Sequence, residues 1–144
     1  MPRDAQCATV GAMRTVLLTL AAAAALMTAV EASAAPRLVM HRTGGVAGVD
    51  DTMVIGARGL GTVTQSGGTP VRLRADQTRA ARRALRAADF DTLDRVYAPK
   101  GTVADGFVYV LRHHGRSVRV EDGADGVPAR LQALITAVLR LLAG

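Results

Sequence analysis

The sequence predicts an α+β domain: an antiparallel β-sheet of about four to five strands, covered on one face by two main helices. Three observations lead to this fold class. Short stretches of alternating apolar residues are joined by glycine-containing turns, two longer stretches have the period of amphipathic helices, and no β-α-β alternation is present. The 144 residues, 49% of them hydrophobic, are enough for one packed domain.

Strands are expected first in the N-terminal half of this domain. Residues 37–43 alternate in polarity and run into a glycine-rich turn. Residues 51–57 and 60–65 flank Arg58-Gly59, a two-residue connection that favours a hairpin because glycine tolerates the backbone angles of a tight turn. Residues 71–73 are expected to form a short edge strand.

A helix is expected over residues 75–88, where the period changes to 3.6. The pattern predicts an apolar stripe and an opposite arginine stripe. We expect Asp76 to pair with Arg79, and Asp89 with Arg86, because these residues are three apart on one side of the helix. The apolar stripe is Thr78, Ala81, Leu85 and Ala88, and the basic stripe is Arg79, Arg82, Arg83 and Arg86.

The second main helix is expected to open at Val127-Pro128, because proline suits the first helical turn. Its apolar face is broad and ends at Leu142. Between the two helices, Phe90, Leu93 and Tyr97 are spaced by three and four residues, which predicts a further short helical turn over the core.

The clearest local prediction is a hairpin between residues 105 and 122. If His114-Gly115 forms a two-residue turn, Leu111 lies opposite Val118 and the apolar residues of both strands share one face. A shift of one residue would place Val118 opposite Arg112 and break this match. The hydrophobic pattern therefore selects the register.

The N-terminus has the pattern of an export signal. Arg3 and Arg14 precede residues 16–30, which carry no charge and are too few to span a bilayer comfortably. Small residues follow, and cleavage is expected after Ala34. The sequence thus predicts a signal peptide over 1–34, a single domain over 35–144, and an exported protein, secreted or held in the periplasm or cell envelope; a retained N-terminal anchor is the alternative.

Candidate catalytic and metal-binding groups are sparse. The single cysteine, Cys7, lies in the leader, which excludes a disulfide framework and a cysteine-based zinc site. Neighbouring strand residues point to opposite faces, so His113 and His114 are not expected to chelate together. Ser66 and Ser117 have no recognisable catalytic partner. We therefore expect no enzyme activity, no catalytic residue, no cofactor and no metal.

The arginine stripe of the first helix has two interpretations. It is a solvated helix face, or it binds an anionic polymer or a negative patch on a protein. Nucleic acid is not expected as a partner, because the protein is expected to be exported. In addition, the pattern assigns its four aromatic residues outside the leader to the core, which leaves none interleaved with the arginines for base stacking.

Several short segments, taken in order, follow the pattern of a known family: residues 42–48, 88–90, 105–109, 115–118 and 122–123. Together they resemble the emfourin family, and the resemblance spans residues 38–142. Thr43 stands where that family commonly has serine, and this chain is expected to carry a signal peptide in addition.

Emfourins are small inhibitors of protealysin and related thermolysin-like metalloproteases, so the resemblance implies an α+β inhibitor that docks in a protease cleft without turnover. It implies a metalloprotease, or another exported protein, as the partner. The alternative is an exported interaction or envelope-associated domain of the same fold without inhibitory activity. The leading contact candidates are in the glycine-rich turn, where backbone can approach a partner closely: Gly44, Gly45, Val46, Ala47 and Gly48.

Overall fold

The computed structural model describes residues 37–143. The predicted signal peptide and its cleavage site lie outside the described residues. None of the helices in the described part combines the length and the apolar character that a membrane span requires.

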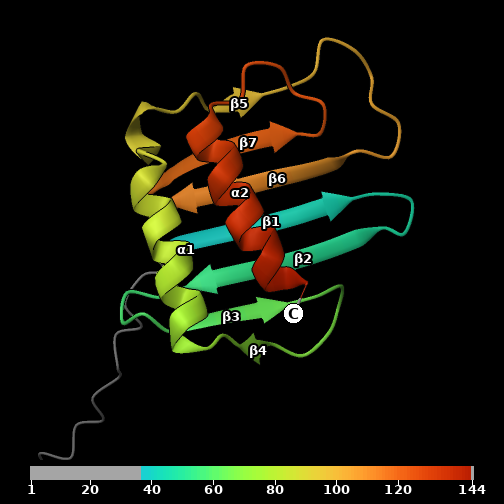
Figure 1. The fold of residues 1–144 in the computed structure, drawn as a ribbon. Helices are drawn as coiled ribbons and strands as arrows, with labels where there is room; N and C mark the ends of the chain where they lie inside the picture. Colours follow the sequence, from blue (N-terminus) through green and yellow to red (C-terminus); the bar gives the residue numbers. More distant parts are fainter. Residues whose placement is uncertain (1–36, 144) are drawn as a thin grey trace, which may run out of the picture. The chain divides into compact units, whose positions relative to one another are not determined.

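One mixed, mostly antiparallel sheet forms the base of the domain (Figure 1). The first strand of the chain lies at its centre, between the second strand and the sixth. The strand order is β4-β3-β2-β1-β6-β7-β5, with bounds β1 (Leu38–Gly44), β2 (Val49–Ile55), β3 (Gly61–Thr64), β4 (Val71–Arg72), β5 (Val96–Tyr97), β6 (Phe107–His113) and β7 (Arg116–Glu121).

The α+β fold class is confirmed, but the sheet has seven strands where four to five were predicted. The segment around Tyr97 explains part of the difference. Only Phe90–Thr92 forms a helical turn, of the 3₁₀ type, and Val96–Tyr97 then pairs in parallel with β7. Spacings of three and four residues predicted a helix there, whereas the hydrogen bond from the Arg119 amide to the Arg95 carbonyl, at 2.8 Å, draws this segment onto the sheet edge.

The predicted hairpin of β6 and β7 is confirmed in its register. Leu111 lies opposite Val118, and Tyr109 lies opposite Val120. His114, in the turn, has a φ of 46° and Gly115 has a φ of 79°, as a turn with two positive φ angles requires.

Both helices, α1 (Ala75–Ala87) and α2 (Ala129–Leu142), cover the same face of the sheet (Figure 1). The apolar residues of the sheet's inner face and of the two helices make one core within residues 38–142, so the predicted domain 35–144 contains all of it. Its largest fully buried side chains are Leu38, Met40, Met53, Ile55, Leu93, Leu111, Leu131, Leu134, Val118 and Val138.

The ion pairs predicted within α1 are wrong. Asp76 pairs with Arg74, at 3.4 Å, because Arg74 sits at the helix N-cap next to it. Asp89 pairs with Arg130 of α2, at 3.7 Å, because the packing of the two helices brings the start of α2 beside the end of α1. Neither aspartate neutralises Arg79 or Arg86.

Candidate functional site

The candidate site is the turn that joins β1 and β2. The Gly48 amide donates a hydrogen bond to the Gly45 carbonyl over 3.0 Å and closes the turn. Val46 at the tip is 87% exposed, the highest value among the exposed large hydrophobic side chains of the described part. Ala47 and Gly48 are exposed as well. The turn therefore presents an aliphatic side chain to solvent.

The glycines of this turn have different physical roles. Gly44 has a φ of 117°, and a Cβ there would overlap the carbonyl oxygen of Gly106. Gly45 has a φ of 73°, and its Cβ would come within 2.9 Å of the Phe107 ring. Gly48 also has a positive φ, 62°, but open space around it. Close packing thus requires Gly44 and Gly45, and the accessible part of the turn is its tip.

An ion pair between a half-buried arginine and a buried aspartate supports the base of the turn. Arg42 and Asp51 lie opposite each other on β1 and β2, with 2.6 Å between Nη2 and Oδ2, and Asp51 is 3% exposed. The guanidinium of Arg42 lies 4.9 Å from the centroid of the Phe107 ring, which adds a cation–π contact. Asp51 also accepts a hydrogen bond of 3.2 Å from the Ser66 amide. The strands that carry the turn are thereby fixed from the helix-covered side.

A second loop reaches the same end of the sheet, and sequence analysis did not single it out. Residues 98–106 connect β5 to β6 and place Val103 in solvent, 44% exposed. Val103 packs against Gly106 and Gly123, where added Cβ atoms would lie 3.1 and 3.0 Å from its methyl groups. The signal in the sequence was an apolar residue between Gly101 and Gly106.

This loop encloses one side of a hollow of about 440 Å³, whose floor is the start of β6 and the end of β7. Because Gly44 and Gly45 pack on Gly106 and Phe107, the bases of the two loops touch. The two exposed valines, Val46 and Val103, therefore lie on adjoining loops at one end of the sheet.

Tyr109 and Asp122 hold the start of β6 beneath these loops. The Asp122 carboxylate accepts a hydrogen bond of 2.9 Å from the Phe107 amide. Burial raises the pKa of Tyr109, and the charge of Asp122 and its hydrogen bond to the phenol raise this pKa further, while Arg42 opposes them. The phenol therefore stays protonated beside the carboxylate.

The remaining residues considered at the sequence level do not assemble into a reactive site in the described part of the chain. His41 contacts the Asp50 carboxylate over 2.6 Å, and the Ser66 hydroxyl accepts a hydrogen bond of 3.2 Å from the Asp50 amide. The His113 and His114 rings meet edge to face, with centroids 4.2 Å apart. No group of three or more potential ligands that could hold a metal occurs among the described residues.

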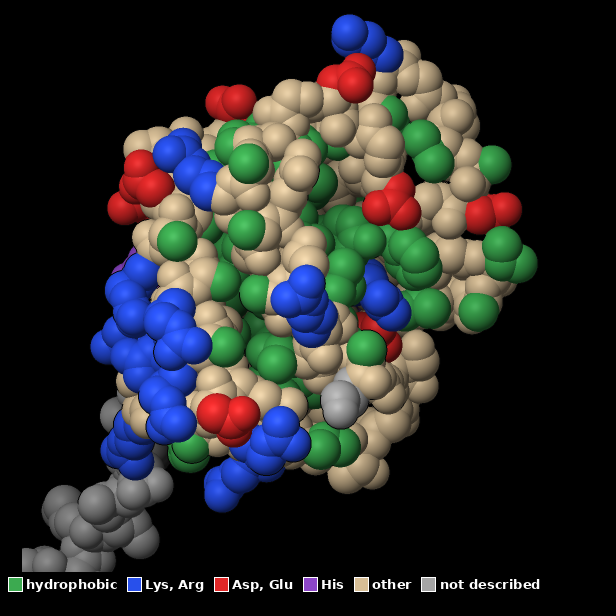
Figure 2. Space-filling view, viewed as in Figure 1, with side chains coloured by type: hydrophobic (Ala, Val, Ile, Leu, Met, Phe, Trp, Pro, Cys, Tyr) green, Lys and Arg blue, Asp and Glu red, His purple; other side chains and the backbone are tan. Residues whose placement is uncertain are grey.

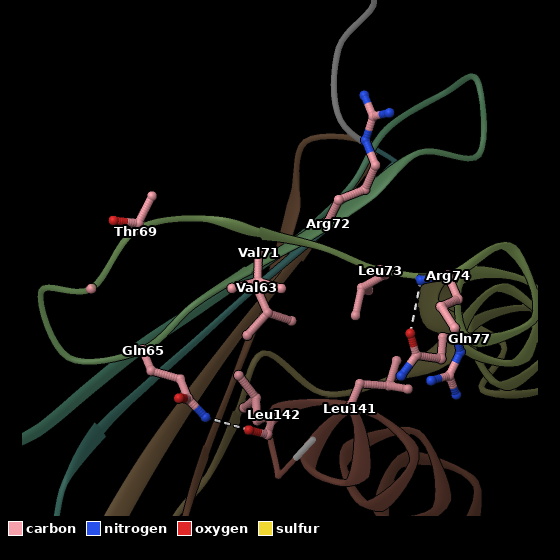
Figure 3. Close-up of a pocket in the computed structure, with 11 residues that line it drawn as sticks. Val63, Gln65, Thr69, Val71, Arg72, Leu73, Arg74, Gln77, Leu141 and Leu142 are labelled. Carbon is pink, nitrogen blue, oxygen red and sulfur yellow. Dashed lines mark hydrogen bonds between the residues drawn. The ribbon is translucent and has the colours of Figure 1, made fainter.

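A separate groove of about 390 Å³ lies where α2 ends short of β4 (Figure 3). Both aliphatic and polar side chains line it, arginine and glutamine among them, and Val71 at the sheet edge is 66% exposed. The side-chain amide of Gln65 donates to the carbonyl of Leu142 and closes one end (Figure 3). None of the predicted contact residues lines this groove.

No protein-family model matches this chain, and no curated protein sequence matches it.

Proposed function

We propose that this protein is an exported inhibitor of a thermolysin-like metalloprotease and acts by inserting the β1–β2 turn into the protease cleft without being turned over. The partner is a metalloprotease, and the contact residues are Val46, Ala47 and Gly48, with Gly44 and Gly45 holding the turn in place. The exposed valine at the tip of a braced turn carries this proposal, together with the resemblance to the emfourins.

The β1–β2 turn is preorganised for binding. A loop that is already ordered loses less conformational entropy when it binds, so more of its contact energy remains as affinity. The Arg42–Asp51 pair and the packing of Gly45 on Phe107 fix the base of this turn, while Val46 stays exposed. A fixed, exposed aliphatic side chain is suited to fill an apolar pocket in a partner.

The test uses residues 35–144 and a panel of thermolysin-type proteases. The protein is first recovered from the extracellular or periplasmic fraction, where an intact mass beginning at Ala35 is expected. Residual protease activity is then titrated against the parent, Val46→Glu and Leu60→Glu. Leu60 is the matched control, because it is an exposed aliphatic side chain, 54% accessible, in the turn between β2 and β3.

We expect the parent to inhibit at least one protease, Val46→Glu to weaken inhibition by tenfold or more, and Leu60→Glu to inhibit like the parent. Circular dichroism checks that both variants are folded. A folded Val46→Glu variant with parental inhibition would remove the turn from the mechanism. A parent that inhibits none of the proteases would favour the exported interaction domain.

A further inference from the structure

The structure carries a second surface, at the end of the sheet away from the β1–β2 turn. This surface, the basic face, consists of the four α1 arginines at positions 79, 82, 83 and 86, together with the β2–β3 turn. Figure 2 shows Lys and Arg side chains gathered over α1 on one side of the molecule. The seven residues of β1 separate this end from the β1–β2 turn by about 20 Å, at about 3.3 Å per strand residue.

The charges of the four α1 arginines are not neutralised within the described part of the chain. None of the four arginines makes an ion pair with a described residue, and the two aspartates nearest in sequence, Asp76 and Asp89, pair with Arg74 and Arg130. Elsewhere, Arg42 and Arg119 each have an acidic partner.

Concentrating these charges on one helix opposes folding. Arg79 lies three and four residues before Arg82 and Arg83, and Arg86 lies four and three residues after them. Like charges at these spacings repel across the helix surface. Arg82 also reaches over the neighbouring turn, since its Nη1 lies 3.0 Å from the place of a Cβ on Gly59. The face is therefore a compact, continuous patch of one sign.

The position of the first described residue indicates what kind of partner the basic face binds. The Arg37 amide donates to the Ile55 carbonyl over 2.7 Å, so the described part of the chain begins beside the β2–β3 turn. In the sequence, this point follows the charge-free stretch 16–30, which is expected to enter a bilayer during export. The basic face thus borders the end of the domain that first follows this stretch.

We infer that the basic face docks on the surface of a bilayer rich in anionic phospholipid. Guanidinium groups bind phosphate oxygens with a fork of donors, and polybasic segments near a membrane are held by its negative surface potential. The apolar sides of α1 are buried, so contact is electrostatic and does not require insertion of the helix. In this orientation the β1–β2 turn points away from the membrane; the inference does not rest on the inhibitory function.

The experiment measures co-sedimentation of residues 35–144 with vesicles of equal parts phosphatidylglycerol and phosphatidylcholine, and with vesicles of phosphatidylcholine alone. This segment contains the whole core, and it lacks the apolar stretch that would itself partition into lipid. One variant changes the four α1 arginines to glutamine, a good helix former. The matched control removes the same charge elsewhere, with Arg95, Arg112, Arg119 and Arg140 changed to glutamine.

We expect the parent to bind the anionic vesicles and not the neutral ones, and to release them as salt is raised from 20 to 300 mM. Each arginine near a membrane surface contributes a factor of about 5, so removing four of them should weaken binding of the α1 variant by about 600-fold, while the control binds nearly as the parent does. Equal losses in the two variants would overturn the assignment to α1.

Absence of anionic-vesicle binding by the folded parent at 20 mM salt would overturn the inference altogether. Stronger binding to soluble polyglutamate than to vesicles of the same charge concentration would overturn the membrane assignment in favour of an acidic polymer. Protease inhibition by the α1 variant is measured in parallel, and we expect it to be unchanged, so that failure of one proposal is distinguishable from failure of the other.

Discussion

Replacing Gly44 with alanine tests whether the β1–β2 turn is held by close packing on β6. The added methyl group meets backbone atoms, since its carbon would overlap the Gly106 carbonyl oxygen and lie 3.2 Å from the Phe107 Cα. Backbone atoms of a paired strand cannot rotate away, so β1 and β6 must separate locally. Gly48→Ala is the matched control, because its φ is also positive but no atom lies within 4 Å of the new carbon.

The loss of unfolding free energy in each variant follows from its backbone angle and from these contacts. A positive φ in a residue other than glycine costs about 1–2 kcal/mol, and this applies to both variants. Steric overlap in a packed region adds about 1–3 kcal/mol, and this applies to Gly44→Ala alone. We therefore expect the free energy of unfolding to fall by about 2–5 kcal/mol for Gly44→Ala and by about 1–2 kcal/mol for Gly48→Ala.

Urea unfolding followed by far-UV circular dichroism measures both values by linear extrapolation. Protease inhibition is measured on the same samples, at a urea concentration of zero where both variants are folded. We expect Gly44→Ala to lose inhibition, because displacement of β1 moves the turn. Equal unfolding free energies for Gly44→Ala and Gly48→Ala would refute the packing argument.

Two further predictions concern the β6–β7 hairpin. Leu111 is fully buried, so Leu111→Ala should lower the free energy of unfolding by about 2–5 kcal/mol. Arg119→Ala breaks an exposed ion pair with Glu121 and should lower it by about 1 kcal/mol or less. Comparable losses for the two variants in chemical denaturation would contradict the observed faces of the hairpin. The pKa of Tyr109 is raised above its usual value of 10.0, so its stabilising contribution is present below pH 10 and is lost as the pH rises through the folded-state pKa. The unfolding free energy of the parent should therefore fall more steeply between pH 10 and 11 than that of Tyr109→Phe, and parallel pH profiles would contradict this.

Local patterns in the sequence determined most of the elements and the register of one hairpin. The alternation around Leu111 and Val118, with glycine at position 115, leaves one hairpin register that buries both apolar sets, and the structure has it. The apolar stripe of residues 75–88 likewise determined α1, and its boundaries differ from the expected ones by a single residue. These signals are readable because period and turn chemistry act over a few neighbouring residues.

The tertiary structure alone decided which strands are neighbours and what the turn glycines pack against. The pattern of residues 37–43 does not predict that β1 lies between β2 and β6, because strand pairing joins segments far apart in the chain. The same pairing separates Gly44, which meets Gly106, from Gly48, which meets nothing, although the sequence presents them alike. It also brings the loop of Val103 to the β1–β2 turn and Arg130 to Asp89, since side-chain contacts between distant segments are set only when the layers pack.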